Sequence, residues 1–421
     1  MGRGPSVQNN HAVTSLTISM IAIGRRILLL SMLAAASCAA QPMGRIAAYD
    51  PHNLPSVRDA PTSAAKWPHW RRSLHRWEWT RIPGTDLSAI VPSPPVPGSP
   101  RARIDAWNGL AADVRTSRLF SADNGGHADY AGNEVYAIDL ALDAPRWKML
   151  RAPTPADEIL QSDYTKKTYN DYYRDGRPSS THTYYALQFI GSRNAIFKFG
   201  AGALWGTGNE ANWKTDAFSL GEMDWQPAGS WPDVEANSRK DVIAASICKN
   251  PLTDEVYVAA PEGLLRFDPV AGKYEFLSRW PDNASAVAAR ACAVDTRRKQ
   301  VVYFGDAYRP PDGGLLYEEK SRFLQRIKFG GPAAPEIMAG KYHFAWYDPE
   351  ADRFVLKTGI AGRVYAIDPD TRAVTGIPTS GGDNVPDAVN GVQTRWQRLP
   401  ELGGYAYYPR AGSGIWFLAT Q

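Results

Sequence analysis

The chain has 421 residues and a formal net charge of +4, and 11% of its residues are aromatic. It contains no run of Lys and Arg that would form a basic stripe, so we expect no nucleic-acid partner. Its 36 Gly and 32 Pro are spread along the chain, which is typical of many short turns, and the Trp and Tyr content favours strands over helical bundles.

Residues 1–40 have the pattern of an export signal. Two arginines precede a short apolar run that begins at Ile27, and small residues follow around Cys38. The run is too short to span a bilayer. Cleavage near Ala40 and lipidation at Cys38 both fit this pattern. We therefore predict an exported protein that is periplasmic, extracellular or lipid-anchored, with a lipid at Cys38 as its one expected membrane contact.

Three features precede the repeats. Residues 41–75 are largely polar and lack a clear periodicity, which predicts a leader arm. Residues 76–82 alternate in polarity as a strand does. The segment from Pro92 to Pro100 contains five prolines, and we expect a linker that cannot enter the interior of a sheet.

From Ile104 onward the sequence repeats a unit of four strands with a polar turn after the first. Five full units and a half unit fit the chain, and the full units begin near Trp107, Thr181, Ala244, Ala289 and Tyr342. The strand at 76–82 would complete the last unit and so remove an exposed sheet edge. We predict an all-β fold, a β-propeller of six four-stranded blades over residues 76–421 closed by this N-terminal strand. Seven blades stay open as an alternative.

The first unit carries the most specific pattern. It has a double glycine at 125–126 after its second strand, the segment 133–136 (Asn-Glu-Val-Tyr) opening the third strand, and Trp147 in the fourth. These features resemble the kelch-type β-propellers, a superfamily that includes the central domain of galactose-oxidase-like proteins. The resemblance implies a propeller over residues 76–421.

Cys248 and Cys292 are expected on inner strands of neighbouring units. They precede their turn residues by two and three positions, so they point to opposite sides of their strands and can face each other. A disulfide and a pair of buried thiols both fit an oxidising compartment. The copper-radical chemistry of galactose oxidase needs a thioether-forming Cys–Tyr pair and two His ligands, and we do not expect it here.

Long segments are predicted on one face of the ring, because strand direction alternates within a blade. They are Asn124–Gly132, Arg151–Ser180, Gly200–Trp213, Pro227–Lys240 and Asp306–Ser321. The opposite face carries short turns. Long ordered loops tend to carry function, so we expect the ligand on the long-loop face.

Aligning the inner strands by their turns places polar side chains at equivalent positions around the axial mouth of that face. The catalytic candidates are His127, His182, Tyr184, Arg290 and His343. The predicted ligand-binding residues are Asn108, Asn124, Asp129, Tyr130 and Trp205. Imidazoles, a phenol and a guanidinium at one mouth can perform acid–base chemistry on an anionic substrate. Bonding within the loop for His127 and Asp129, and packing in the channel wall for Tyr184 and His343, are the structural alternatives.

Two functions fit these predictions. The first is binding of an acidic polysaccharide with lyase-type or epimerase-type chemistry, in which Arg290 would neutralise the substrate carboxylate. The second is a non-catalytic scaffold that binds a glycan or a protein partner. No cofactor is predicted, and a structural calcium ion at Asp123, Asn124 and Asp129 is left open. Convergence of the candidate side chains around one cavity would favour an enzyme.

Overall fold

The computed structural model describes residues 67–208, 211–234, 243–281, 289–305 and 313–421. The predicted export signal, Cys38 and most of the predicted arm lie outside the described residues. Within these ranges no helix is both long enough and apolar enough to cross a membrane.

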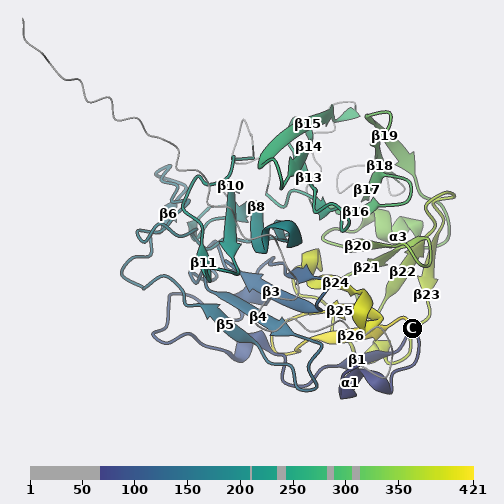
Figure 1. Cartoon of the computed structure of the whole chain (residues 1–421), viewed down its shortest axis with the longest axis horizontal. Helices are drawn as coiled ribbons and strands as arrows, with labels where there is room; N and C mark the ends of the chain where they lie inside the picture. The colour runs from purple at the N-terminus through teal and green to yellow at the C-terminus, as the bar shows by residue number, and fades with distance from the viewer. Residues whose placement is uncertain (1–66, 209–210, 235–242, 282–288, 306–312) are drawn as a thin grey trace, which may run out of the picture. The chain divides into compact units, whose positions relative to one another are not determined.

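Six four-stranded antiparallel sheets are arranged around an axis as the blades of a β-propeller (Figure 1). Blade 1 is formed by β2 (Ala111–Asp113), β3 (Arg118–Ala122), β4 (Val135–Asp139) and β5 (Lys148–Arg151). Blade 2 is formed by β7 (Leu187–Ile190), β8 (Ala195–Ala203), β10 (Ala211–Ser219) and β11 (Asp224–Trp225). Blade 3 is formed by β12 (Ile247–Lys249), β13 (Val256–Ala260), β14 (Gly263–Asp268) and β15 (Lys273–Arg279).

The other three blades follow the same plan. Blade 4 is formed by β16 (Ala291–Asp295), β17 (Gln300–Phe304), β18 (Gly313–Glu318) and β19 (Phe323–Lys328). Blade 5 is formed by β20 (Phe344–Asp348), β21 (Arg353–Lys357), β22 (Val364–Ile367) and β23 (Val374–Ile377). Blade 6 is formed by β24 (Trp396–Leu399), β25 (Gly404–Tyr407), β26 (Trp416–Ala419) and β1 (Trp79–Arg81).

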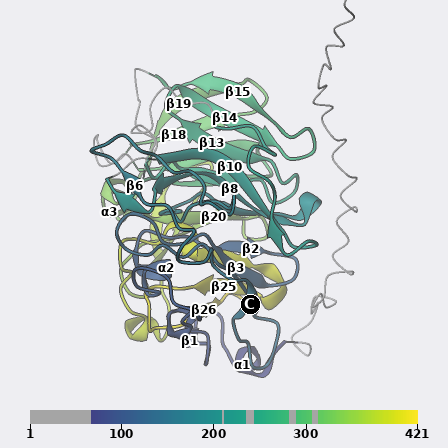
Figure 2. The ribbon, with the colours of Figure 1, turned by 90° about the vertical axis from the view of Figure 1, so that its left-hand side faces the viewer.

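The ring closes as predicted, because β1 is the outer strand of blade 6. Thr80 pairs with Phe417 in an antiparallel register, and β1 lies beside β26 in both views (Figures 1 and 2). The side chain of Trp79 is buried, and its ring lies 5.8 Å from that of Trp396. The prediction of six blades closed by an N-terminal strand is therefore confirmed.

The helices and strands outside the blades are short. A parallel pair, β6 (Ser162–Asp163) and β9 (Gly206–Thr207), ties the long connection after blade 1 to a loop of blade 2. The helices α1 (His69–Arg72), α2 (Ala102–Asp105) and α3 (Ala334–Ala339) have six residues or fewer. The expected loop Gly200–Trp213 is largely strand, since β8 runs to Ala203 and β10 begins at Ala211.

Repeated aspartates explain the sharp turns after the inner strands. Asp113 and Asp295 each accept a hydrogen bond from the backbone N–H two residues later, at 3.2 and 2.9 Å. This side-chain-to-backbone bond mimics a backbone turn, so Asp at the end of an inner strand directs the chain back into the second strand. It is the physical basis of the repeat that the sequence displays.

Each inner strand is entered through a residue with a positive φ angle. These residues are Trp107, Tyr184, Ala244, Ala289, Tyr342 and Gln393. Backbone hydrogen bonds link them from blade to blade, for example Ala289 N–H to the Ala244 carbonyl at 2.8 Å and Tyr342 N–H to the Ala289 carbonyl at 2.9 Å. Because β7 ends at Ile190, the position equivalent to Asn108 is Tyr185, and the sequence alignment of blade 2 was displaced by one residue.

Aromatic pairs between opposite blades close the axis near the long-loop face. The ring of Tyr184 in the entry to blade 2 stacks on Tyr342 in the entry to blade 5 at 5.9 Å. One residue further, Tyr185 stacks on Phe344 at 6.1 Å. The Tyr185 hydroxyl also donates to the His343 carbonyl at 3.0 Å.

A disulfide joins the inner strands of blades 3 and 4. It connects Cys248 of β12 to Cys292 of β16, whose Cα atoms are 5.7 Å apart. Of the two alternatives that the sequence allowed, the structure contains the bridge.

Candidate functional site

The loop Asn124–Gly132 is held in one conformation by its neighbours. The Gly125 N–H donates to the Thr181 carbonyl at 3.0 Å, and the Ser99 N–H donates to the Asp129 carbonyl at 2.9 Å. Gly126 has a φ of +82°, and a Cβ atom there would lie 2.3 Å from the backbone nitrogen of His182. Only glycine allows this approach, and the loop therefore brings its own side chains against the entry to blade 2.

The closest contact across this junction joins Asp129 to His182. Nε2 of His182 lies 2.8 Å from Oδ2 of Asp129, and the side chain of Asp129 is 39% exposed whereas that of His182 is 5% exposed. The hydrogen bond from His182 lowers the pKa of Asp129. Burial lowers the pKa of His182, and the contact with Asp129 opposes this effect. The pair is therefore an ionised carboxylate beside a neutral imidazole at neutral pH.

These charge states define the proton positions. An ionised carboxylate can only accept a hydrogen bond, so Nε2 of His182 carries the proton and Nδ1 is left as the acceptor. A carboxylate that orients an imidazole in this way fixes its tautomer. The pair can thus accept a hydrogen bond through Asp129 and hold a proton between the two groups.

Three aromatic rings lie around His182. The centroid of its imidazole lies 5.3 Å from Trp107, 6.0 Å from His127 and 5.9 Å from Tyr184. Tyr342 joins this cluster through its stack on Tyr184. We refer to Trp107, His127, Asp129, His182, Tyr184 and Tyr342 as the aromatic mouth. His127 adopts a φ of +44°, a left-handed conformation that costs about 1–3 kcal/mol and is frequent at functional sites.

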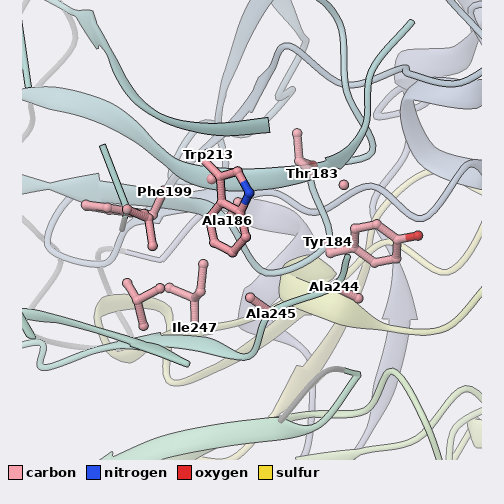
Figure 3. A pocket seen from close by; sticks show the side chains of 12 residues that line it. Thr183, Tyr184, Ala186, Phe199, Trp213, Ala244, Ala245 and Ile247 are labelled. Carbon is pink, nitrogen blue, oxygen red and sulfur yellow. The ribbon is translucent and has the colours of Figure 1, made fainter. Parts of the chain in front are cut away.

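A narrow space of about 10 Å³ adjoins the mouth between blades 2 and 3. Figure 3 shows Phe199 and Trp213 on one side of it and Ala244, Ala245 and Ile247 on the other, with the Tyr184 hydroxyl directed away from Trp213. Its walls are mainly apolar and it has room for about one water molecule, so it offers neither a ligand cavity nor acid–base chemistry.

A buried ion pair supports the segment that carries His182. Nζ of Lys198 lies 2.5 Å from Oδ2 of Asp123 and 3.3 Å from Oδ2 of Asp216, and all three side chains are buried. Thr181, the residue before His182, donates to Asp123 at 3.2 Å. Burial raises the pKa of Asp123, and the ammonium group of Lys198 opposes this. The pair connects β8 to the end of β3, and thereby blade 2 to blade 1.

Two of the predicted catalytic residues lie apart from the aromatic mouth. Arg290 is 3% exposed, and its charge acts on the buried phenol of Tyr303 in blade 4. It is on the same side of its strand as Cys292, because side chains two residues apart share a face. His343 packs against Gly340, and burial together with Lys357 lowers its pKa to about 4. These contacts of the two side chains are with residues outside the aromatic mouth.

Three predicted ligand-binding residues belong to the interior, because their polar atoms have internal partners. Asn108 accepts from the Thr183 N–H at 2.9 Å, and Asn124 accepts from the Thr183 hydroxyl at 2.6 Å. The Tyr130 hydroxyl donates to Glu134 at 2.8 Å. All three side chains are buried and bonded internally, and that they contact a ligand stays a prediction. Trp205 is partly exposed and pairs through its backbone with His127.

The three residues considered for calcium have separate partners. Asp123 pairs with Lys198, Asn124 binds Thr183 and Asp129 binds His182. In the part of the chain that the structure describes, no group of three His, Cys, Asp or Glu residues is placed to hold a metal ion.

The sequence alignment missed Trp107 and Tyr342. Each is the residue immediately before a candidate that was chosen, Asn108 and His343, and each has a positive φ. The sequence signal that could have identified them is an aromatic residue at the position that enters an inner strand. A left-handed residue directs its side chain differently from its extended neighbour, and periodicity cannot reveal this.

Comparisons with known proteins identify no family for this chain. No family model matches the chain, and no curated protein matches it. Among solved structures, the chain is similar to one titled "Structure of YjhT", with a TM-score of 0.45, 12% identity and coverage of 76% of this chain and 95% of that one. It is also similar to one titled "Crystal structure of Nidogen/Laminin Complex", with a TM-score of 0.37, 9% identity and coverage of 66% and 80%. At these values neither likeness bears on function.

Proposed function

We propose that this protein is an exported propeller of kelch type that binds a carbohydrate at the aromatic mouth. The observation that carries the proposal is the Asp129–His182 pair, whose partly exposed carboxylate is oriented at 2.8 Å by a buried imidazole among aromatic rings. The double glycine at 125–126 and the signal-like pattern of residues 1–40 support the kelch and export parts of the proposal.

Each part of the mouth has a task in sugar binding. Asp129 accepts hydrogen bonds from ring hydroxyl groups through the oxygen that His182 does not occupy. Trp107 and Tyr342 are partly exposed and offer apolar faces to the sugar ring, and Tyr184 supports Tyr342 from below by stacking on it. Aromatic groups with a few convergent polar atoms are typical of small-molecule sites. The fixed loop Asn124–Gly132 limits the entropy that binding costs, because Asp129 is already in place.

The same pair supports acid–base chemistry of the lyase or epimerase type. His182 is neutral and oriented, as a general base must be. The ring centroid of His127 lies 6.0 Å from that of His182. Among the described residues that form the mouth, none is Lys or Arg, so these residues give no support to the selection of an acidic sugar. The substrate class we propose is therefore carbohydrate, without restriction to uronic acids.

The test is a calorimetric titration of the mature protein with a panel of neutral and uronate-containing oligosaccharides, with turnover followed by the absorbance of unsaturated uronates. We expect at least one member to bind. Asp129→Ala should weaken its affinity about ten- to a hundredfold, because a hydrogen bond to a charged group contributes about 1.5–3 kcal/mol.

The matched control is Asp370→Ala, which removes a carboxylate that is 71% exposed on the short-turn face. This variant should bind as the wild type does. Equal affinity of the wild type and folded Asp129→Ala would move the site elsewhere. If no oligosaccharide binds, the carbohydrate proposal fails and a protein-binding scaffold stands in its place.

A further inference from the structure

The axial channel has a second opening, on the face of the short turns. Here a hollow of about 290 Å³ lies among the first residues that follow the inner strands. It is lined by Val114, Arg115, Pro251, Leu252, Thr296, Trp346, Tyr347, Pro349, Arg398 and Pro400. Its volume is close to the lower end of the range of about 300–1,000 Å³ that is typical of small-molecule sites.

The hollow continues inward and then ends. The inner space that follows has a volume of only about 10 Å³, which is room for about one water molecule. It shares Pro251, Trp346 and Tyr347 with the hollow and reaches Phe344. The Phe344 ring stacks on Tyr185 at 6.1 Å, where the aromatic pairs close the axis. The channel is therefore blind, and a molecule that enters from the short turns cannot reach the aromatic mouth.

The walls combine apolar surface with positive charge. Among the described residues that line the two spaces, three are cationic, Arg115, Lys249 and Arg398, and none is a carboxylate. Each cation is paired with a carboxylate outside the lining: Asp254 lies 3.8 Å from Arg115 and 3.2 Å from Lys249, and Asp348 and Glu350 lie 3.2 and 3.5 Å from Arg398. The remaining lining is mostly proline, aliphatic and aromatic.

We propose that this blind channel is a second ligand site that binds a small amphipathic organic anion, a molecule with a flat apolar body and one carboxylate or sulfonate group. The apolar body lies between Trp346, Tyr347 and the prolines, and the anionic group lies at the rim near Arg115 and Arg398. Charge complementarity selects the anion, and the blind end limits the length of the apolar body. This site is independent of the carbohydrate proposed for the other face.

The test uses the fluorescent anion 1-anilinonaphthalene-8-sulfonate, titrated into the folded full-length mature protein. We expect one saturable site per chain. Leu252→Asp places a carboxylate at the rim in a side chain that is 74% exposed, so it leaves the fold intact and repels the anion. It should weaken binding about tenfold or more, because like charges in contact are costly. The uncharged analogue N-phenyl-1-naphthylamine should bind more weakly to the wild type.

The matched control is Val270→Asp, since Val270 is also 74% exposed but does not line the channel. It should bind the probe as the wild type does, and so should Asp129→Ala, which alters only the other face. Equal weakening by Leu252→Asp and Val270→Asp, or several equivalent sites per chain, would overturn the proposal. Thermal unfolding of each variant establishes that it is folded.

Discussion

The side chains of Asp129 and His182 differ in exposure, and this difference gives them different roles. The carboxylate is partly accessible, whereas the imidazole is covered by Trp107, His127 and Tyr184. A ligand can therefore contact Asp129 directly, and His182 acts on it by orienting that carboxylate. Binding needs only this arrangement, whereas catalysis additionally needs the ligand to reach His182.

At the same scale, His343 predicts a pH dependence of stability. Its folded pKa of about 4 lies below the ordinary value of 6.5, so the unfolded chain binds more protons between these limits. Stability should be unaffected above pH 6.5 and should fall as the pH drops from 6.5 to 4, by at most about 1.4 kcal/mol per pH unit. Urea unfolding at a series of pH values measures this slope.

His343→Gln should reduce that slope, because the replacement does not titrate. His75→Gln, at an exposed position, serves as the control and should leave the slope as it is in the wild type. A slope that is the same in His343→Gln and the wild type contradicts the assignment to His343.

At the scale of elements, the loop and the blades depend on each other. The loop Asn124–Gly132 is bound by the entry to blade 2 on one side and by the linker on the other, where Gly98 has a φ of +92° and contacts Asp129 and Tyr130. The proline-rich linker stays out of every sheet, as predicted, and covers this loop instead. The geometry of the aromatic mouth therefore depends on the loop, the entry to blade 2 and the linker together.

The ion pair beneath the mouth yields a prediction for these elements. Lys198→Met leaves Asp123 and Asp216 buried without their cation and should lower the free energy of unfolding by about 3–5 kcal/mol. Adding Asp123→Asn and Asp216→Asn should recover much of this loss. Chemical denaturation of the single and triple variants measures both effects.

Lys214→Met is the matched control on neighbouring β10. Lys214 pairs with Asp233 at the same distance, 2.5 Å, but the two side chains are 30% and 46% exposed. Its loss should be at most about 1 kcal/mol. A similar loss in Lys198→Met and Lys214→Met would show that burial of the first pair has no special effect.

At the scale of the whole molecule, closure by β1 sets the architecture. Removal of residues 1–82 would leave β26 as an open edge and would expose the ring partners of Trp79. An unpaired edge strand favours association between chains, so this variant should self-associate and unfold at a lower temperature. Light scattering and calorimetry measure the two effects.

Removal of residues 1–66 alone is the control for that truncation, because β1 and α1 stay in place. It should remain as stable and as monodisperse as the longer chain. A stable, non-associating protein that lacks residues 1–82 would contradict the role of β1.

The sequence was sufficient to predict the ring of blades but not the arrangement of side chains in the aromatic mouth. Blade number and closure follow from a regular repeat of strands and turns, which local patterns such as the aspartate at the end of β16 indicate directly. Side-chain direction at the strand entries depends on left-handed backbone at residues such as Tyr342, and burial of Arg290 depends on the packing of blade 4. No local sequence pattern predicts either feature. The structure therefore brings together only some of the five predicted catalytic residues.

The two openings of the axis lie on opposite faces and are separated by stacked rings. The long-loop face holds the Asp129–His182 pair, whereas the short-turn face holds the larger hollow. Ligands of different chemistry can therefore bind at the same time without contact, and a probe on one face should leave the affinity at the other unchanged.

The most direct test of the central claim is hydrogen exchange, measured by mass spectrometry, with and without the oligosaccharide of the panel that binds most tightly. The account predicts protection of residues 124–132 and 180–185, which form the aromatic mouth and its support. Protection confined to residues 250–253 and 346–350, at the short-turn opening, would contradict it, as would binding without protection at either face.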